Sequence, residues 1–253
     1  MAKGYAERAN YLHSFSAVNH AGFLTRMNEV FLVCEKLSSN HYNQLANLLP
    51  KDREFLLQLA KDEASHIEKL TGYLQGIGVN PDLSYAQHLL VPIHDKFTEA
   101  DRNSDLLSCF VIQTLVIKNF LVCAYLIYLK VVVDDHEKHV IEKILVDEFN
   151  HIDQGMNWLR INTSIASADV AKCINKSVPI VLSMVHIMRF DMKSIGINPN
   201  ELKTEFANYL LESLVEINFS RLKARKLVRS LWASQAMASW EGWPYLRRTA
   251  STF

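Results

Sequence analysis

The sequence predicts an all-α protein built as one bundle of about eight helices. Glycine and proline are scarce, with 8 and 6 among 253 residues, whereas an all-β chain needs many of both at its turns. Apolar residues make up 49% of the chain, enough for a sizeable core. They recur at helical steps of three or four residues. Because no low-complexity linker or long repeat interrupts the pattern, we expect a single domain over residues 1–253, with 239–253 as a C-terminal tail.

The predicted helices follow one another with short breaks. The first covers residues 6–37 and ends in the polar turn Ser38–Asn40, and a short helical piece follows over residues 41–49. Pro50 begins the next helix, which runs to about residue 74, since proline is favoured in a first helical turn. Glycine, asparagine and proline over residues 76–82 stop it. Five more helices are expected over residues 84–100, 104–132, 134–162, 166–193 and 199–238.

Charge and cysteine usage exclude several classes of function. Lysine plus arginine and aspartate plus glutamate both total 27, and no basic stripe is present, so nucleic acid is not an expected partner. The N-terminus lacks a basic start followed by an apolar core and a cleavage site, which favours a cytoplasmic protein. The widely spaced cysteines are expected to be reduced core residues: Cys34, Cys109, Cys123 and Cys173.

One apolar stretch, residues 109–133, is long enough to span a bilayer. Lys118 and Asn119 interrupt it, and a lysine at the centre of a lone spanning helix is costly. A helix surrounded by other helices is apolar on all sides for a different reason. We therefore expect a buried helix and no stable membrane insertion, with a membrane span as the alternative.

Two Glu-x-x-His pairs, Glu63/His66 and Glu148/His151, lie 85 residues apart, and Glu35 lies 28 residues before the first. An i, i+3 pair places both side chains on one side of a helix. Two such pairs plus single glutamates from two other helices form the dimetal-carboxylate site of helical bundles. Carboxylates with a few imidazoles suit iron or manganese. The alternative is that the pairs arise by chance and make buried Glu–His hydrogen bonds.

The fourth carboxylate of such a site is expected about 30 residues before Glu148, where the chain carries Lys118. Four carboxylates neutralise two Fe²⁺ ions, whereas three carboxylates and an ammonium leave an excess of positive charge. Lys118 is then a neutral amine, its pKa lowered by burial and the metals, that ligates iron or moves a proton. Otherwise one metal is weak or absent, or Lys118 replaces a metal and pairs with Glu148 and Glu35.

Several segments resemble the cyanobacterial aldehyde-deformylating oxygenases, and the similarity covers about residues 15–235. They are residues 41–50 (HYNQLANLLP), 59–66 (LAKDEASH), 112–117 (IQTLVI), 124–128 (AYLIY) and 147–151 (DEFNH). The resemblance implies a ferritin-like helical fold and a di-iron centre. It also implies conversion of fatty aldehydes to formate and alkanes one carbon shorter, with O2 and external electrons from a donor such as ferredoxin and its reductase.

By matching position, the resemblance implies five metal ligands: Glu35, Glu63, His66, Glu148 and His151. It places five further residues around the metals or in the substrate pocket: Tyr42, Gln113, Tyr125, Tyr128 and Asp147. Lys118 departs from the family pattern, which has glutamate there.

These observations predict an O2-activating, non-haem dimetal oxidase or oxygenase. We expect two iron ions per chain, with manganese possible, and Lys118 and Tyr125 as catalytic residues. The expected substrate is small or lipophilic and enters an apolar tunnel between the helices, in a site retuned for specialised metabolism. One alternative is the fatty-aldehyde reaction of the family itself. Another is a non-catalytic bundle that binds one metal ion or none.

Overall fold

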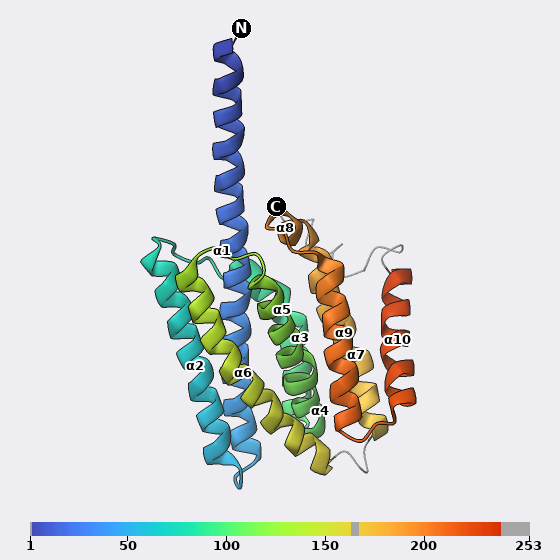
Figure 1. Cartoon of the computed structure of the whole chain (residues 1–253). Helices are drawn as coiled ribbons and strands as arrows, with labels where there is room; N and C mark the ends of the chain where they lie inside the picture. The colour runs from blue at the N-terminus through green and yellow to red at the C-terminus, as the bar shows by residue number, and fades with distance from the viewer. Residues whose placement is uncertain (1, 163–166, 239–253) are drawn as a thin grey trace, which may run out of the picture.

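The computed structural model describes residues 2–162 and 167–238, and every regular element among them is helical, as expected (Figure 1). The elements are α1 (Ala2–Leu48), α2 (Arg53–Gly76), α3 (Ser84–Arg102), α4 (Leu106–Phe110), the π-helix η1 (Val111–Lys118), α5 (Asn119–Tyr128), α6 (Asp135–Asn162), α7 (Ser167–Ile187), α8 (Arg189–Ser194), α9 (Pro199–Glu216) and α10 (Arg221–Ala238).

The elements α4, η1 and α5 follow one another as a continuous rod through the middle of the molecule (Figure 1). This central rod packs against α1, α3, α6, α7 and α9. Helices α1 and α2 form an antiparallel hairpin beside it, and α6 packs on both α2 and the rod (Figure 1). The four-helix arrangement of α1, α2, the rod and α6 is the part of the fold that positions the candidate site.

The apolar stretch that resembled a membrane span forms this rod. The helical stretch Leu106–Tyr128 reaches a mean hydropathy of 1.9, but 83% of its most apolar 18 residues are buried inside the protein. A helix enclosed by other helices is apolar on every side for that reason. The helix Ser167–Ile187 is also long and apolar enough to cross a membrane, and half of its most apolar 18 residues are buried. The expectation of a buried core helix is thus confirmed as far as Tyr128, where α5 ends, while Val133 at the end of the predicted stretch is exposed.

The predicted break at Ser38–Asn40 is wrong, because α1 continues through it to Leu48. Ser38 is fully buried, and the Ser39 hydroxyl donates to the Ala60 carbonyl of α2 at 2.9 Å. Asn43 donates its side-chain amide to the Ser39 carbonyl, also at 2.9 Å. The Ser39 side chain, one of those that suggested a turn, instead fastens α1 to α2, so a tertiary contact overrules the local preference.

Two further boundaries differ from the prediction. The expected helix over residues 199–238 is divided, since α9 ends at Glu216 and Asn218 adopts a left-handed conformation with φ of 73° before α10 begins. The expected helix over residues 166–193 ends as α7 at Ile187, and α8 follows as a separate short helix. The tail over residues 239–253 lies outside the described residues.

Candidate metal centre

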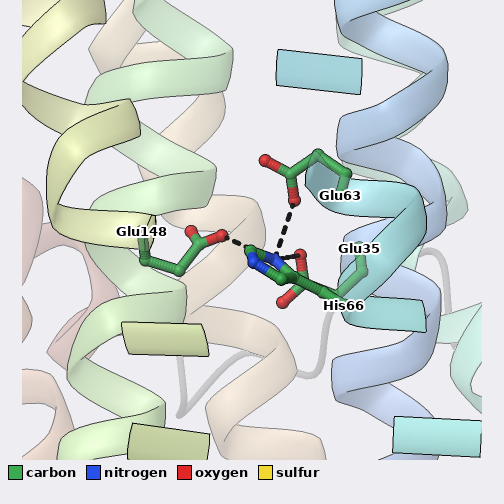
Figure 2. A group of neighbouring side chains, drawn as sticks. All are labelled: Glu35, Glu63, His66 and Glu148. Atoms are coloured by element: carbon green, nitrogen blue, oxygen red, sulfur yellow. Dashed lines mark hydrogen bonds and ion pairs between the residues drawn. The ribbon is translucent and has the colours of Figure 1, made fainter. Parts of the chain in front are cut away.

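The predicted metal ligands meet in the interior of the bundle, although they come from three separate helices. Glu35 lies on α1, Glu63 and His66 on α2, and Glu148 and His151 on α6. Each side chain is almost completely buried. Ligand atoms of Glu35, Glu63, His66 and Glu148 all lie within 4.8 Å of one another (Figure 2). Such convergence can hold a metal ion, and metal binding by these residues stays a prediction.

Lys118, the last residue of the π-helix, points its amine into this cluster. Its Nζ donates to Glu63 Oε2 and to Glu148 Oε1, each at 2.7 Å, and lies 3.6 Å from Glu35 Oε2. Burial opposes the charged amine, but the carboxylates around it outweigh burial and raise the pKa of Lys118 well above its usual value. In this structure Lys118 is therefore an ammonium paired with carboxylates, the arrangement expected if it replaces a metal ion.

A wider turn delivers Lys118 to the cluster. Residues 111–118 form a π-helix, whose looser winding is rare and often found at functional sites. Across from it, a side chain at Gly155 of α6 would collide with Thr114. The glycine therefore lets α6 approach the π-helix closely at this point, about one helical turn after His151.

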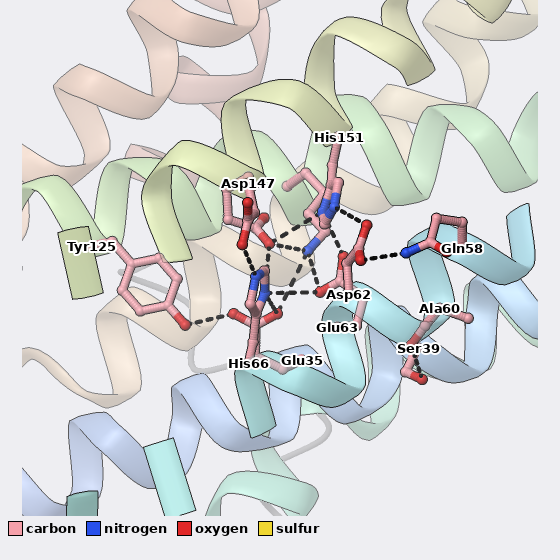
Figure 3. Close-up of polar contacts among 12 residues, drawn as sticks. Glu35, Ser39, Gln58, Ala60, Asp62, Glu63, His66, Tyr125, Asp147 and His151 are labelled. Atoms are coloured by element: carbon pink, nitrogen blue, oxygen red, sulfur yellow. Dashed lines mark hydrogen bonds and ion pairs between the residues drawn. The ribbon is translucent and has the colours of Figure 1, made fainter. Parts of the chain in front are cut away.

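The two histidines are held from behind by aspartates of the opposite helix (Figure 3). His66 of α2 places Nε2 3.1 Å from Asp147 Oδ2 of α6. In the reverse direction, His151 of α6 places Nε2 3.6 Å from Asp62 Oδ2 of α2. A carboxylate behind a histidine commonly orients the ring toward a metal ion. Asp62 was not among the predicted site residues, although the repeated Asp-Glu-x-x-His pattern was a signal that could have identified it.

The remaining nitrogens of the histidines define two sides of the cluster. We call His66 Nδ1 with Glu35 Oε2, Glu63 Oε2 and Glu148 Oε1 the His66 position; these oxygens lie 3.4–3.7 Å from that nitrogen. The same three oxygens surround the Lys118 amine. The His66 position thus has a complete set of donors, but an ammonium already contacts them.

We call His151 Nδ1 with Glu63 Oε1 and Glu148 Oε2 the His151 position. These three buried atoms make no hydrogen bond of good geometry, and His151 Nδ1 lies 2.8 Å from Glu63 Oε1 and 3.5 Å from the other Glu148 oxygen, Oε1. Buried polar atoms without partners are costly, and a cation would satisfy them. The donor set therefore fits a metal ion at the His151 position directly, whereas an ion at the His66 position must compete with Lys118.

Three groups of the cluster have raised pKa values and therefore hold protons readily when no metal ion is bound. Burial raises the pKa of Glu35 to about 8. Although burial lowers the pKa of His66, hydrogen bonds to Glu148, Glu35 and Glu63 outweigh it and raise the pKa to about 12. For His151, the close carboxylates of Glu148 and Glu63 likewise outweigh burial and raise the pKa to about 9. Metal ligands must be deprotonated, so a metal ion entering this cluster would displace protons.

Of the residues expected around the centre, Tyr125 contacts it directly. Its hydroxyl donates to Glu35 Oε1 at 2.5 Å (Figure 3). Gln113 is buried on the π-helix, where its side-chain oxygen lies 2.8 Å from His41 Nδ1. Tyr128 turns away from the cluster and donates to Glu137 Oε1 at 2.7 Å. Glu137, a buried carboxylate of α6, was missed because its sequence neighbours carry no recognisable motif.

Most of the chain matches a known protein family. The model of the family described as long-chain fatty aldehyde decarbonylase matches residues 18–232. The chain belongs to the long-chain fatty aldehyde decarbonylase family. The match includes all the carboxylates and histidines of the cluster, which lie on α1, α2 and α6, and it confirms the resemblance seen in the sequence.

Solved structures agree with this family assignment. A protein from Synechococcus with aldehyde deformylating oxidase activity is similar, with a TM-score of 0.82 and 30% identity over 85% of this chain and 99% of that one. An R2-like ligand-binding oxidase variant with a reconstituted Mn/Fe cofactor has a TM-score of 0.67 over 80% of this chain and 82% of that one. At 15% identity, the second supports the fold alone. The expected ferritin-like, all-α fold is confirmed.

Proposed function

We propose that this decarbonylase-family chain is an O2-dependent iron oxidase or oxygenase, with manganese as a possible alternative ion, that acts on a fatty aldehyde or a similar lipophilic substrate. The observation that carries the proposal is the buried cluster of three carboxylates and two histidines. The family assignment and the deformylating oxidase among similar structures support the same class. A cytoplasmic location, an external electron donor and an apolar substrate tunnel belong to this proposal.

In the proposed centre, Glu63 and Glu148 each face both metal positions, while Glu35 and His66 complete one and His151 the other. Bound iron would supply the open coordination position and the electrons with which O2 is activated. The two positions are unequal because the Lys118 ammonium contacts three oxygens of the His66 position. We therefore expect the His151 position to fill first and the His66 position to bind weakly.

The chain's own residues prepare this centre in four ways. Asp147 and Asp62 orient the histidine rings from behind. Tyr125 orients Glu35 through its hydrogen bond. The apolar rod around the cluster excludes water, which strengthens each electrostatic contact inside. Lys118 holds a proton at Nζ between Glu63 and Glu148, where it can neutralise negative charge that develops on a substrate oxygen.

The proposal is tested by supplying the iron-loaded chain with O2, a chemical reductant and a series of long-chain aldehydes. We expect O2 consumption that depends on both iron and aldehyde, and loss of this consumption in Glu148→Ala. Gas chromatography then identifies the product: an alkane one carbon shorter with formate indicates the family's reaction, and an oxygenated product indicates a retuned site. An iron-loaded chain that consumes no O2 with any aldehyde would contradict the proposal.

A second function is favoured by one specific observation, the ammonium that already donates to two of the carboxylates. A bundle that keeps the fold and uses Lys118 in place of metal needs no iron. Metal content separates the two: this alternative predicts that the chain retains no iron after anaerobic reconstitution, while the oxidase requires at least the His151 position to be filled.

A further inference from the structure

A row of aromatic rings leads from the candidate centre toward the surface. Tyr125 donates its hydroxyl proton to Glu35 at one end. The ring of Phe31 lies 4.3 Å from the Tyr125 ring, centroid to centroid, and 5.3 Å from the Tyr128 ring. All three rings are completely buried. Phe31 thus connects two tyrosines that lie one turn apart on α5.

Beyond Tyr128 the row continues through a buried carboxylate. Glu137 Oε1 accepts from the Tyr128 hydroxyl and from the Asn28 amide, each at 2.7 Å. Its other oxygen accepts from the Tyr73 hydroxyl at 3.0 Å. These three partners are all neutral. A buried carboxylate held by neutral donors is costly in free energy, so it needs a reason beyond packing.

The outer end of the row lies at the rim of the bundle, where α2 ends and α6 begins. Tyr73 is 7% exposed, and its ring lies 5.9 Å from that of His136, which is exposed to solvent. The row therefore passes from a buried carboxylate of the candidate centre, across four helical elements, to a tyrosine that touches solvent. None of these outer residues belongs to the cluster of expected metal ligands.

Tyrosine oxidation explains why a carboxylate would be buried at this point. A tyrosine phenol has a pKa near 10 and holds its proton at neutral pH, but it loses that proton once an electron is removed. A base within hydrogen-bond distance must then accept the proton. Glu137 is such a base for both Tyr128 and Tyr73, and its single carboxylate joins their two hydroxyl groups.

We propose that Tyr73, Tyr128 and Tyr125, bridged by Glu137 and Phe31, conduct single electrons from a donor at the surface to the buried centre. This inference rests on the proposed function, because the oxidised centre is the electron acceptor. The donor is a one-electron reductant such as a reduced flavin or iron–sulfur protein. Tyr125 gives up one electron toward the centre and is restored by Tyr128, which is restored by Tyr73 and then by the donor. The hydroxyl proton of Tyr125 moves to Glu35 on oxidation and returns on reduction.

Each transfer leaves the protein unchanged overall. When Tyr128 loses an electron, its hydroxyl proton moves to Glu137, and the proton returns when Tyr73 supplies an electron. When Tyr73 is oxidised in turn, its proton moves to the same carboxylate and returns once the donor reduces it. The net reaction is therefore the transfer of one electron from the donor to the iron, with no bond broken or formed in the chain.

The test places a photochemical oxidant at the outer end of the row. In the full chain, His136→Cys provides an exposed thiol for a ruthenium photosensitiser, while all four native cysteines are buried. A laser flash with a soluble electron acceptor oxidises the label. In the metal-free protein, transient absorbance and electron paramagnetic resonance then detect a tyrosyl radical. We expect its yield to fall by an order of magnitude or more in Tyr73→Phe.

The iron-loaded, anaerobic protein tests whether the row reaches the centre. After the flash, oxidation of ferrous iron is followed optically, and we expect it to slow by an order of magnitude or more in Tyr73→Phe and in Tyr128→Phe. The matched control is Tyr209→Phe, a half-buried tyrosine of α9, which should leave the rate unchanged. Glu137→Gln should abolish the slowing of the reaction in deuterated water, a readout that a merely structural role would not move.

Unchanged radical yield and unchanged rates in both tyrosine variants would overturn the proposed electron route, provided that circular dichroism shows them folded. Failure of the proposed function gives a different result. In that case the chain binds no iron or does not react with O2, whereas the radical assay on metal-free protein still reports directly on the row of tyrosines.

Discussion

Lys118 Nζ lies 2.7 Å from Glu148 Oε1, in the interior of the bundle. The same amine lies 2.7 Å from Glu63 Oε2, so one ammonium joins the two carboxylates that face both candidate metal positions. One Fe²⁺ ion together with this ammonium balances the charge of the three buried carboxylates. A second ion adds positive charge to a region of low dielectric, which is why we expect unequal positions.

Replacing Lys118 by glutamate should strengthen the weak position. The change removes the competing ammonium and adds the carboxylate that the sequence pattern lacks. We expect Lys118→Glu to retain more iron per chain than the parent after anaerobic reconstitution and desalting, measured with a colorimetric chelator. Lys118→Met is the control, since it removes the charge without adding a ligand, and it should retain less iron than Lys118→Glu. Equal retention in all three proteins would refute the role given to Lys118.

Removing the ammonium should also destabilise the metal-free protein. Lys118→Met leaves Glu63 and Glu148 buried without their cation, and breaking a buried pair costs about 3–5 kcal/mol. Urea unfolding followed by circular dichroism measures this loss. Because Fe²⁺ replaces the missing positive charge, adding it anaerobically should restore more stability to the variant than to the parent. A variant as stable as the parent in chelator would contradict the ion pairing described here.

The crossed aspartates should matter for metal binding although neither reaches the metal positions. Asp147→Asn removes the carboxylate behind His66, and loss of such a partner typically weakens metal affinity about 10–100-fold. Asp62→Asn should act on His151 in the same way, over the longer distance of 3.6 Å. Asp153→Asn is the matched control on the exposed face of α6. Iron titration in competition with a chelator checks all three, and equal affinities would exclude this role.

Iron binding should strengthen as the pH rises. The pKa of Glu35 is raised to about 8 and that of His151 to about 9, so both hold protons at neutral pH in the metal-free protein. Metal binding must release these protons, and a higher pH removes them beforehand. We expect the apparent affinity for Fe²⁺ to increase from acidic toward alkaline pH, measured anaerobically with a chelator of known pH dependence. A constant or falling affinity over that range would contradict this assignment.

Close packing at Gly155 gives a test that does not depend on metal. A side chain at this position would meet Thr114 of the π-helix, and overpacking of this kind costs about 1–3 kcal/mol. Gly155→Ala should therefore lower the free energy of unfolding in urea. Gly72→Ala is the control: no atom lies within 4 Å of its added carbon, and alanine in a helix interior should stabilise by about 0.5–1 kcal/mol. Equal effects from the two changes would contradict the described packing.

The convergence of the predicted carboxylate and histidine side chains could be read from the sequence because that information is local, while their role as metal ligands stays a prediction. Glutamate and histidine three residues apart must share one side of a helix, and the spacing of Glu35 and Lys118 fits two antiparallel hairpins. The helical class followed from composition and periodicity in the same way. Lys118 was identified by its spacing alone, and the structure brings its amine to the predicted cluster.

Features that depend on contacts between helices were not predictable from one sequence. The pairing of Asp147 with His66, rather than with the histidine of its own helix, is set by the relative position of α2 and α6. The uninterrupted course of α1 depends on a hydrogen bond from Ser39 to the Ala60 carbonyl of another helix. The π-helix also had no local signature, since its residues are apolar like those of an ordinary buried helix.

The most direct test of the proposed centre is an anaerobic titration of the metal-free chain with Fe²⁺, followed by desalting, iron analysis and exposure to O2 with absorbance recorded. The unequal positions predict one tightly held iron ion per chain and a second that binds weakly and is lost on desalting. They also predict an O2-dependent visible band that grows when the second position is kept filled. Two ions retained with equal affinity, or no iron retained and no band, would contradict the proposed centre.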